Sequence, residues 1–307
     1  MAKPSRTVIE YRNYELEPEF PILMLAGNRW HISDIKSGRL HFHNCLEVGI
    51  CHTDSGIMEF YGSPRSFYAG DVTCIARNVP HTTYSNPGQA SLWTYLFFSP
   101  QELLRSYFQD MLPAGGLYTG MLQDCNMILS ASEYPEIYQL AMMIKHEIEE
   151  KPMNYQISVR GLCLSLLMAF LRIYAQTAKK PEEKKSGDTL PIAPALDYIH
   201  ANYMYDFPME YLADLCHISP THFRRIFHSI MQQSPLKFIH ATRIMESCTL
   251  LRSTEESIAA ISEQVGYGSV SSYNRHFIQN MGCAPNQFRR SVSPIANPSI
   301  LEYTGWF

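Results

Sequence analysis

Residues 20–98 alternate short apolar or aromatic runs with residues that favour turns. The runs are FPILMLA, LEVGIC, IMEFY, DVTCIA and SLWTYLFF, and Gly, Pro, Asn and Ser separate them. Runs of this length and spacing are typical of antiparallel strands joined by tight turns. The pattern therefore predicts several short strands that close into a small β-barrel or jelly roll.

A helical period follows, and it predicts two long helices over residues 136–149 and 156–176. The second helix is apolar on most sides, with rows at Leu164, Leu167, Leu171 and Tyr174 and at Leu162, Leu166, Phe170 and Ile173. Such a helix must be covered on more than one side. We expect the barrel to cover one face. Either a second subunit covers another, giving a homodimer, or all contacts stay within the domain. The run LCLSLLMAFL is too short to span a bilayer of about 30 Å, so no membrane partner is expected.

Residues 177–191, TAKKPEEKKSGDTLP, are charged, contain Gly and Pro, and have no apolar period. This composition is typical of a flexible linker. The predicted organisation is thus an α+β chain of two domains. Residues 1–176 hold the barrel and the two long helices, and residues 192–307 form an all-α domain.

Two short helices joined by a tight turn are predicted near the end of the chain. Ile258, Ile261 and Val265 share one face of a helix that Gly266 ends. Ser269 is a suitable N-cap for the next helix. This arrangement is typical of a helix-turn-helix motif.

The motif is repeated. Phe223, Arg225 and Phe227 recur 50 positions later as Tyr273, Arg275 and Phe277. In the first copy, Ser219 is the cap, and a polar stripe runs through Thr221, Arg224, Arg225 and His228. Two copies with matched caps and arginines indicate a double helix-turn-helix domain rather than two solvated amphipathic helices.

Polar stripes on such helices suit the major groove of double-stranded DNA. Arginine can hold guanine, and asparagine can hold adenine, through two hydrogen bonds each. The formal net charge of the chain is −4. This excludes a protein that coats nucleic acid through bulk basicity. Residues 190–290 carry eight Lys and Arg against eight Asp and Glu, so binding must depend on a few local cations.

The segments LADLCHISPTHFRRIF and ISEQVGYGSVSSYNRHFIQNMGCAPNQFRR resemble the DNA-binding domain of AraC/XylS-type transcription regulators over about residues 192–290. The resemblance implies base-facing side chains and one phosphate contact, Arg275. The base-facing positions it implies are Thr221, Arg224, Arg225, Val270, Ser271 and Asn274. The chain departs from the family at His217, where the turn of the first copy usually has glycine, and in MQQSP, which lacks the glycine before Ser-Pro.

The segment HFHNCLEVG places His41, His43 and Glu47 at matching parity, so in one continuous strand they would face the same side. The alternative is that Asn44 and Cys45 form a bulge that breaks this shared face. AGDVTCIARNVPH then ends at His81. These segments resemble the cupin-like sensor domain of AraC-type regulators. The resemblance implies a small-molecule pocket in the barrel, and in metal-binding cupins the matching residues hold a divalent ion.

Three interpretations of these four residues stay open. They face solvent or cap turns; they bind a polar effector such as a sugar; or they hold zinc, nickel or iron. For the effector, Trp30, Trp93 or a nearby tyrosine is expected to provide a stacking face.

The sequence therefore predicts an effector-responsive, sequence-specific transcription regulator with RNA polymerase as a further partner. No enzyme activity and no obligatory cofactor are expected. The alternative is a metal-dependent cupin enzyme with a DNA-binding tail. The eight cysteines form no Cys-x-x-Cys pair, and the N-terminus has no apolar signal core, so we expect a cytoplasmic protein.

Overall fold

The structure, a computed structural model, describes residues 8–14, 16, 20–60, 63–105, 125–177 and 190–291. The chain forms two compact units, made mainly by residues 20–190 and by residues 191–297. Most of the predicted linker (178–189) and the end of the predicted C-terminal domain (292–307) lie outside the described residues. The exact domain boundaries therefore stay a prediction.

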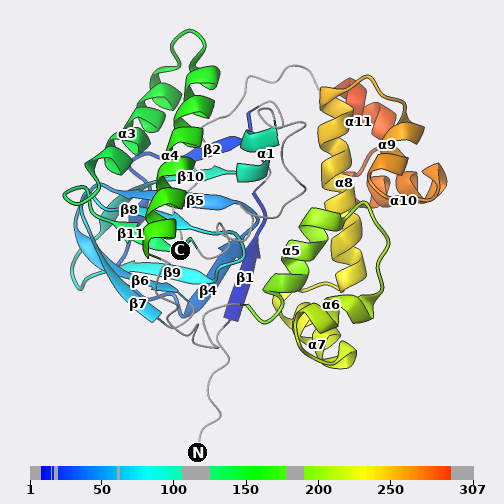
Figure 1. The fold of residues 1–307 in the computed structure, drawn as a ribbon, viewed down its shortest axis with the longest axis horizontal. Helices are drawn as coiled ribbons and strands as arrows, with labels where there is room; N and C mark the ends of the chain where they lie inside the picture. Colours follow the sequence, from blue (N-terminus) through cyan, green and yellow to red (C-terminus); the bar gives the residue numbers. More distant parts are fainter. Residues whose placement is uncertain are drawn as a thin grey trace, which may run out of the picture. The chain divides into compact units, whose positions relative to one another are not determined.

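The first unit contains two β-sheets (Figure 1). The five-stranded sheet has the order β1-β4-β9-β6-β7, and the six-stranded sheet has the order β11-β8-β5-β10-β2, with β3 pairing to β10. The strands are β1 (Val8–Arg12), β2 (Ile22–Leu25), β3 (His31–Ile32), β4 (Arg39–His43), β5 (Leu46–Cys51), β6 (Ser55–Phe60), β7 (Ser63–Tyr68), β8 (Val72–Ile75), β9 (His81–Ser85), β10 (Ser91–Phe98) and β11 (Met127–Leu129).

The prediction of short strands over residues 20–98 is confirmed, but two strands lie outside that range. β1 pairs in parallel with β4, and β11 pairs with β8. Their sequences, VIEYR and MIL, are too short to show a period, and only their neighbours in the sheets define them as strands.

Alternate residues of the six-stranded sheet enter two different cores. Val48, Ile50 and Leu96 belong to a cluster that includes the buried sides of α3 (Pro135–Glu150) and α4 (Tyr155–Thr177). Trp93 and Tyr95, of opposite parity, pack with side chains of the five-stranded sheet. The two sheets thus enclose one core, and α1 (Pro100–Arg105), α3 and α4 take part in the other.

The two long helices are confirmed, since α3 and α4 match the predicted ranges within one residue at each end. Among the described helices, α4 alone is long and apolar enough to cross a membrane. Only a third of its most apolar window is buried within the structure. Its buried residues pack against α3 and the six-stranded sheet, which is the arrangement of a core helix.

The second unit is helical in its described part. Its helices are α5 (Ala193–Asn202), α6 (Met209–Leu215), α7 (Pro220–Met231), α8 (Pro235–Ser253), α9 (Ile258–Gln264), α10 (Val270–Met281) and α11 (Pro285–Ser291). Serines cap α7, α8, α9 and α10, and each accepts a hydrogen bond from a backbone N–H of the first turn. At the 50-residue shift the serine cap is repeated in one pair of helices, α7 with Ser219 and α10 with Ser269.

The turn of the second helix pair is one residue longer than that of the first. His217, the second residue after α6, has a left-handed backbone with φ +54°. The equivalent residue after α9 is Gly266, with φ +87°, so the two positions are 49 residues apart. Gly268 is the extra residue of the second turn, so the N-caps Ser219 and Ser269 are again 50 residues apart. Gln232 likewise adopts φ +54° where the second copy has Gly282. Both departures from the family pattern are thus left-handed positions filled by residues other than glycine.

Close packing explains why glycine is needed at only one of the two turns. A Cβ atom at Gly266 would collide with the backbone of Met204. His217, by contrast, is exposed, so only the strain of its backbone conformation opposes its side chain.

We predict opposite effects of substitution at these two turns. Gly266→Ala should lower the free energy of unfolding by about 2 kcal/mol, because it adds a backbone collision to left-handed strain. His217→Gly should leave stability unchanged or raise it by up to about 1 kcal/mol, because it removes that strain. Urea denaturation of the full chain measures both. Equal destabilisation by the two variants would contradict the packing argument.

Candidate functional site

The segment with His41, His43 and Glu47 is not one continuous strand. β4 ends at His43, the chain turns at Asn44 and Cys45, and β5 belongs to the other sheet. The shared strand face expected for a continuous strand is therefore not formed, because the chain is interrupted at Asn44 and Cys45. The side chains still meet, because the turn carries Glu47 to the opposing sheet, where it faces back toward His43. His43 Nε2 lies 3.1 Å from Glu47 Oε2.

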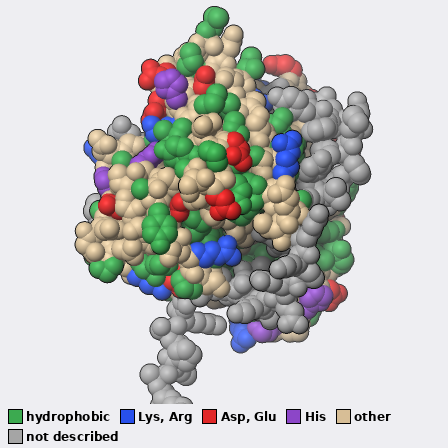
Figure 2. All heavy atoms as spheres, turned by 60° about the vertical axis from the view of Figure 1, so that its left-hand side comes forward, with side chains coloured by type: hydrophobic (Ala, Val, Ile, Leu, Met, Phe, Trp, Pro, Cys, Tyr) green, Lys and Arg blue, Asp and Glu red, His purple; other side chains and the backbone are tan. Residues whose placement is uncertain are grey.

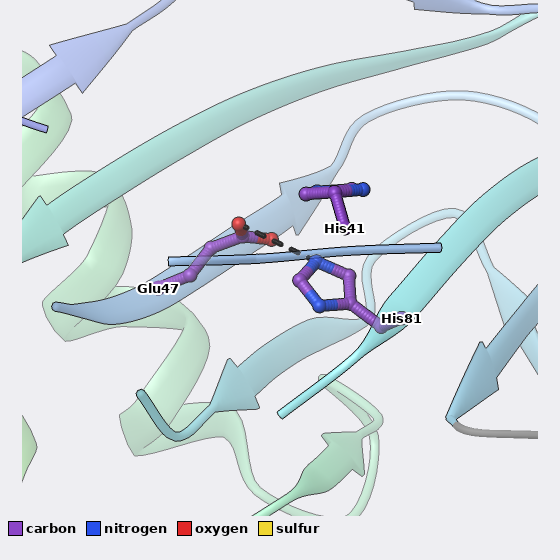
Figure 3. A group of neighbouring side chains, drawn as sticks. All are labelled: His41, Glu47 and His81. Carbon is purple, nitrogen blue, oxygen red and sulfur yellow. Dashed lines mark ion pairs between the residues drawn. The ribbon is translucent and has the colours of Figure 1, made fainter. Parts of the chain in front are cut away.

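His81 joins this group from a third strand. It stands opposite His41 in the β4–β9 pairing, and the two rings are 4.1 Å apart. Its Nε2 lies 3.6 Å from Glu47 Oε2. Figure 3 marks this ion pair with a dashed line. The ligand atoms of His41, Glu47 and His81 all lie within 4.8 Å of one another. We call His41, His43, Glu47 and His81 the histidine–glutamate cluster.

Backbone carbonyl groups fix the orientation of two of the imidazoles. His43 Nδ1 lies 2.8 Å from the carbonyl oxygen of Cys45, and His81 Nδ1 lies 3.0 Å from that of Val79. A carbonyl oxygen only accepts, so each Nδ1 must carry the hydrogen. Each Nε2 is buried, makes no hydrogen bond with the described residues, and lies within ion-pair distance of the carboxylate.

The buried charge of Glu47 needs a positive partner. Burial would raise the pKa of its carboxyl, but the charges of His81 and His43 outweigh burial and hold that pKa below its ordinary range. Burial and the neighbouring His81 lower the pKa of His41 well below its ordinary value. An Nε2 lone pair would repel the carboxylate, so the cluster favours a proton or another cation at this point.

The aromatic rings closest to the cluster are not the predicted tryptophans. His43 contacts Phe97 and Tyr14, with ring centroids 5.6 and 6.2 Å away. Trp30 and Trp93 are buried and pack on Tyr95, which adjoins Phe97 along β10. Their contact with an effector stays a prediction.

Tyr14 is a further aromatic residue beside the cluster, and no local pattern in the sequence singles it out among the tyrosines. The Asn44 amide accepts a hydrogen bond from Tyr14 N at 2.9 Å and donates one to Tyr14 O at 3.0 Å. The Tyr14 ring stacks on Phe97 at 4.0 Å. A ligand at the cluster would therefore lie close to the N-terminal segment, which Asn44 holds beside β4.

The second candidate site lies on α7. Phe223 and Phe227 are fully buried, and the opposite face exposes Thr221, Arg224, Arg225 and His228. Arg224 is 59% exposed and lies 3.6 Å from the carboxylate of Glu210, which is 60% exposed. Water screens an ion pair this exposed, so Glu210 binds the guanidinium of Arg224 only weakly.

α10 presents a matching face. Tyr273 and Phe277 are buried at the positions equivalent to Phe223 and Phe227, while Val270, Ser271 and Arg275 are exposed. Asn274 differs, because it is half-buried and its Oδ1 is buried with no hydrogen-bond partner among the described residues. The shift of 50 also identifies Ile278, 49% exposed, as the counterpart of His228, which the sequence analysis missed.

Comparison with known proteins finds one matching family model and several related transcription regulators. Residues 212–291 match the family model described as a helix-turn-helix domain. A putative AraC-like transcription regulator of Streptomyces lividans is 24% identical over 87% of this chain and 92% of its own. The HTH-type transcriptional activator RhaR of Mannheimia succiniciproducens is 22% identical over 94% of this chain and 93% of its own.

Among solved structures, the C-terminal domain of AraT, a response regulator from Geobacillus stearothermophilus, is similar to this chain. It is 28% identical, covers 35% of this chain and 91% of its own, and superposes with a TM-score of 0.32.

Proposed function

Because the C-terminal end of the chain is an AraC-type helix-turn-helix domain and its relatives are AraC-like transcription regulators, we propose that the chain is an effector-responsive regulator that binds specific DNA sequences. Residues 1–176 would form the cupin-like jelly-roll sensor and residues 192–307 the DNA-binding domain, joined by a linker at 177–191. The observation that carries the proposal is the pair of equivalent exposed faces on α7 and α10, each opposite a buried aromatic pair.

In this proposal, α6–α7 and α9–α10 are two helix-turn-helix units, with α7 and α10 as recognition helices. Two units on one face of DNA contact successive major grooves about 34 Å apart. Because the helical region is charge-neutral, phosphate contacts come from a few arginines such as Arg275, and binding depends on sequence more than on bulk attraction. The bound regulator would act on RNA polymerase in the cytoplasm.

The first unit is proposed to bind a small polar effector, with the histidine–glutamate cluster as its polar contact. A sugar hydroxyl can both donate and accept, so it can satisfy the carboxylate and an Nε2 lone pair together. An effector bound there shifts the population of DNA-bound protein only as far as its affinity differs between the free and DNA-bound arrangements. Trp30 and Trp93 belong to the same apolar core as Phe97, whose ring contacts His43, and would provide apolar surface for the effector.

A divalent cation also fits these residues. The fixed Nδ1–H groups and the buried Nε2 atoms beside a charged carboxylate match the usual arrangement of metal-binding histidines. His41, Glu47 and His81 would hold the ion, and His43, which the sequence analysis included, lies beside Glu47 outside this group of three. Zinc, nickel or iron suit such a donor set. When bound, the ion would supply positive charge to attract an oxygen atom of the effector. Because the relatives are regulators, we do not propose a metal-dependent enzyme.

A homodimer through α3 and α4 completes the proposal. Figure 2 shows hydrophobic side chains among acidic ones on this side of the first unit. Met143, Met153 and Ile157 are exposed, and α4 adds the half-buried Leu164 and Met168. A second copy would cover this apolar surface, which otherwise faces water.

The arginines of the two recognition helices should differ in effect. Arg224→Ala should remove about 1–3 kcal/mol of preference for the selected sequence over scrambled DNA. Arg275→Ala should weaken binding to both DNAs by the same factor. It should also reduce the number of ions released on binding, taken from the salt dependence of affinity, by about one. Fluorescence anisotropy with both duplexes at several salt concentrations measures this. Arg29→Ala, at an exposed position between β2 and β3, is the control for net charge. Equal affinity of the wild type for both DNAs would exclude sequence-specific binding.

The cluster should bind Co²⁺, Ni²⁺ or Zn²⁺, or else a sugar. Whichever binds should raise the melting temperature of the full chain, because it stabilises only the folded state. Replacing His43 and Glu47 together by Ala should abolish this rise without leaving one buried charge alone, and DNA binding should persist. His146→Ala, an exposed histidine on α3, is the matched control. A normal melting shift in the double variant would place the pocket elsewhere.

The proposed dimer is tested by sedimentation velocity. The wild type should sediment as a dimer at micromolar concentration. Ile157→Lys should sediment as a folded monomer, because it puts a charge into the apolar contact at a site that is 72% exposed in one chain. A monomeric wild type would assign the apolar surface of α4 to contacts within the chain.

A further inference from the structure

The contact between α8 and α10 contains two stacked imidazole rings. His240 lies on α8 and His276 on α10, and their ring centroids are 3.9 Å apart with planes only 14° from parallel. Tyr267, in the turn before α10, adjoins both rings, with centroids 5.6 and 5.7 Å away. Its hydroxyl oxygen lies 3.3 Å from His240 Nδ1. Three rings from three consecutive segments thus meet where α10 packs on α8.

His276 does not belong to the exposed face of α10. It follows Arg275 by one residue, which rotates its side chain by about 100° around the helix axis. Arg275 is exposed, whereas His276 is half-buried against the half-buried His240. The imidazole pair is therefore a contact between two helices rather than part of the proposed DNA-contacting face.

The charged groups around the pair are mainly positive, and they come from each neighbouring segment. Arg243 of α8 and Arg275 of α10 both act on His240, and Arg275 also acts on His276. Asp206, between α5 and α6, acts on His240 in the opposite sense. Its Oδ1 lies 3.1 Å from a guanidinium nitrogen of Arg243, so its charge is already paired. An added proton on either ring therefore meets a net positive environment.

This environment keeps both rings neutral at neutral pH. Burial, His276, Arg243 and Arg275 together lower the pKa of His240 to about 4. Burial and Arg275 lower the pKa of His276 as well. Neutral aromatic rings can stack closely, but two imidazolium rings at this distance would repel each other. Arg243 cannot move away to relieve that repulsion, because its donors are bound to backbone carbonyls.

The direction of the pH effect follows from these lowered pKa values. An imidazole released from the contact has its ordinary pKa of about 6.5. The packed arrangement therefore binds protons less readily than the released one, so its stability is full above pH 6.5 and falls as the pH drops toward 4. For two half-buried rings screened by water, we expect about a fivefold shift toward the released arrangement between pH 7.5 and 5.5.

From this geometry we propose that His240 and His276 form a proton-sensitive contact whose protonation loosens α10 from α8 and lowers the affinity for specific DNA. The effect on DNA rests on the proposed function, because α10 carries one of the two DNA-contacting faces. His240 and His276 act as positioning residues, since neither lies on that face.

The expected sign is opposite to the general effect of acid on DNA binding. His222 and His228, both exposed on α7, gain positive charge as the pH falls. Added positive charge attracts phosphates and strengthens binding. A loss of affinity on acidification would therefore point to the contact between α8 and α10 rather than to bulk electrostatics.

The first experiment measures amide hydrogen exchange of α10 in the full-length protein without DNA at pH 7.5, 6.5 and 5.5, corrected for the intrinsic pH dependence of exchange. Protection of α10 in the wild type should fall about fivefold over this range. His276→Phe and His276→Gln remove one titrating ring, so the loss should be about twofold or less. His276→Arg carries a permanent charge and should reduce protection already at pH 7.5. His146→Phe, at an exposed position on α3, is the control and should behave as the wild type.

The second experiment measures affinity for the selected duplex by fluorescence anisotropy at the same pH values and constant ionic strength. Wild-type affinity should fall about fivefold between pH 7.5 and 5.5, in step with the loss of protection. The affinity of His276→Phe should stay constant or rise, because only the general attraction then responds to acid. Circular dichroism of each variant at each pH confirms folding.

The outcomes separate this proposal from the function on which it rests. Absence of sequence-specific binding at every pH would contradict the proposed function alone, since exchange in the free protein still tests the contact. Equal protection of α10 at pH 7.5 and 5.5 in the wild type would overturn the proton-sensitive contact. Loosening of α10 with a wild-type affinity that rises on acidification would overturn its link to DNA binding. Parallel losses in the wild type that both neutral variants reduce would support the proposal.

Discussion

The C-terminal unit depends on one buried guanidinium. Arg243 of α8 donates to the carbonyl oxygens of Tyr203 (2.7 Å), Gly266 (2.6 Å) and Tyr205 (3.0 Å), and to Asp206 Oδ1 (3.1 Å). A buried cation is tolerated only when its donors are satisfied, and here three backbone carbonyls and a carboxylate satisfy them. The planar, multiply donating group suits this task, which the single ammonium of lysine could not perform.

These hydrogen bonds join elements that are far apart in sequence. They connect the segment after α5, the long helix α8 and the turn between α9 and α10, while the ring of Tyr267 packs under the guanidinium. The same turn excludes a side chain at Gly266, since Met204 lies against it. The placement of α10 relative to α8 thus depends on this contact, and so does the relation between the two candidate DNA-contacting faces.

The N-terminal unit contains the opposite case. Glu47 is a buried anion, and imidazoles surround it whose Nδ1 atoms are committed to backbone carbonyls. Carbonyl groups of the fold accept the hydrogen bonds of Arg243, whereas the buried Nε2 atoms of His43 and His81 make no hydrogen bond within the described part of the chain. A structural network is normally satisfied, so the imbalance marks the cluster rather than Arg243 as the place where a ligand would act.

The sequence alone determined the elements whose pattern is local. Strand and helix periods, serine caps and the 50-residue repeat all depend on residues within a few positions of one another, and they predicted α3, α4 and the paired helices α6–α7 and α9–α10. Tertiary structure decided what depends on distant backbone. It alone showed that the chain changes sheets between His43 and Glu47, that Asn44 holds Tyr14, and that Met204 makes glycine necessary at 266 but not at 217. Each of these depends on how segments that are distant in sequence pair or pack, and a local sequence pattern does not report that.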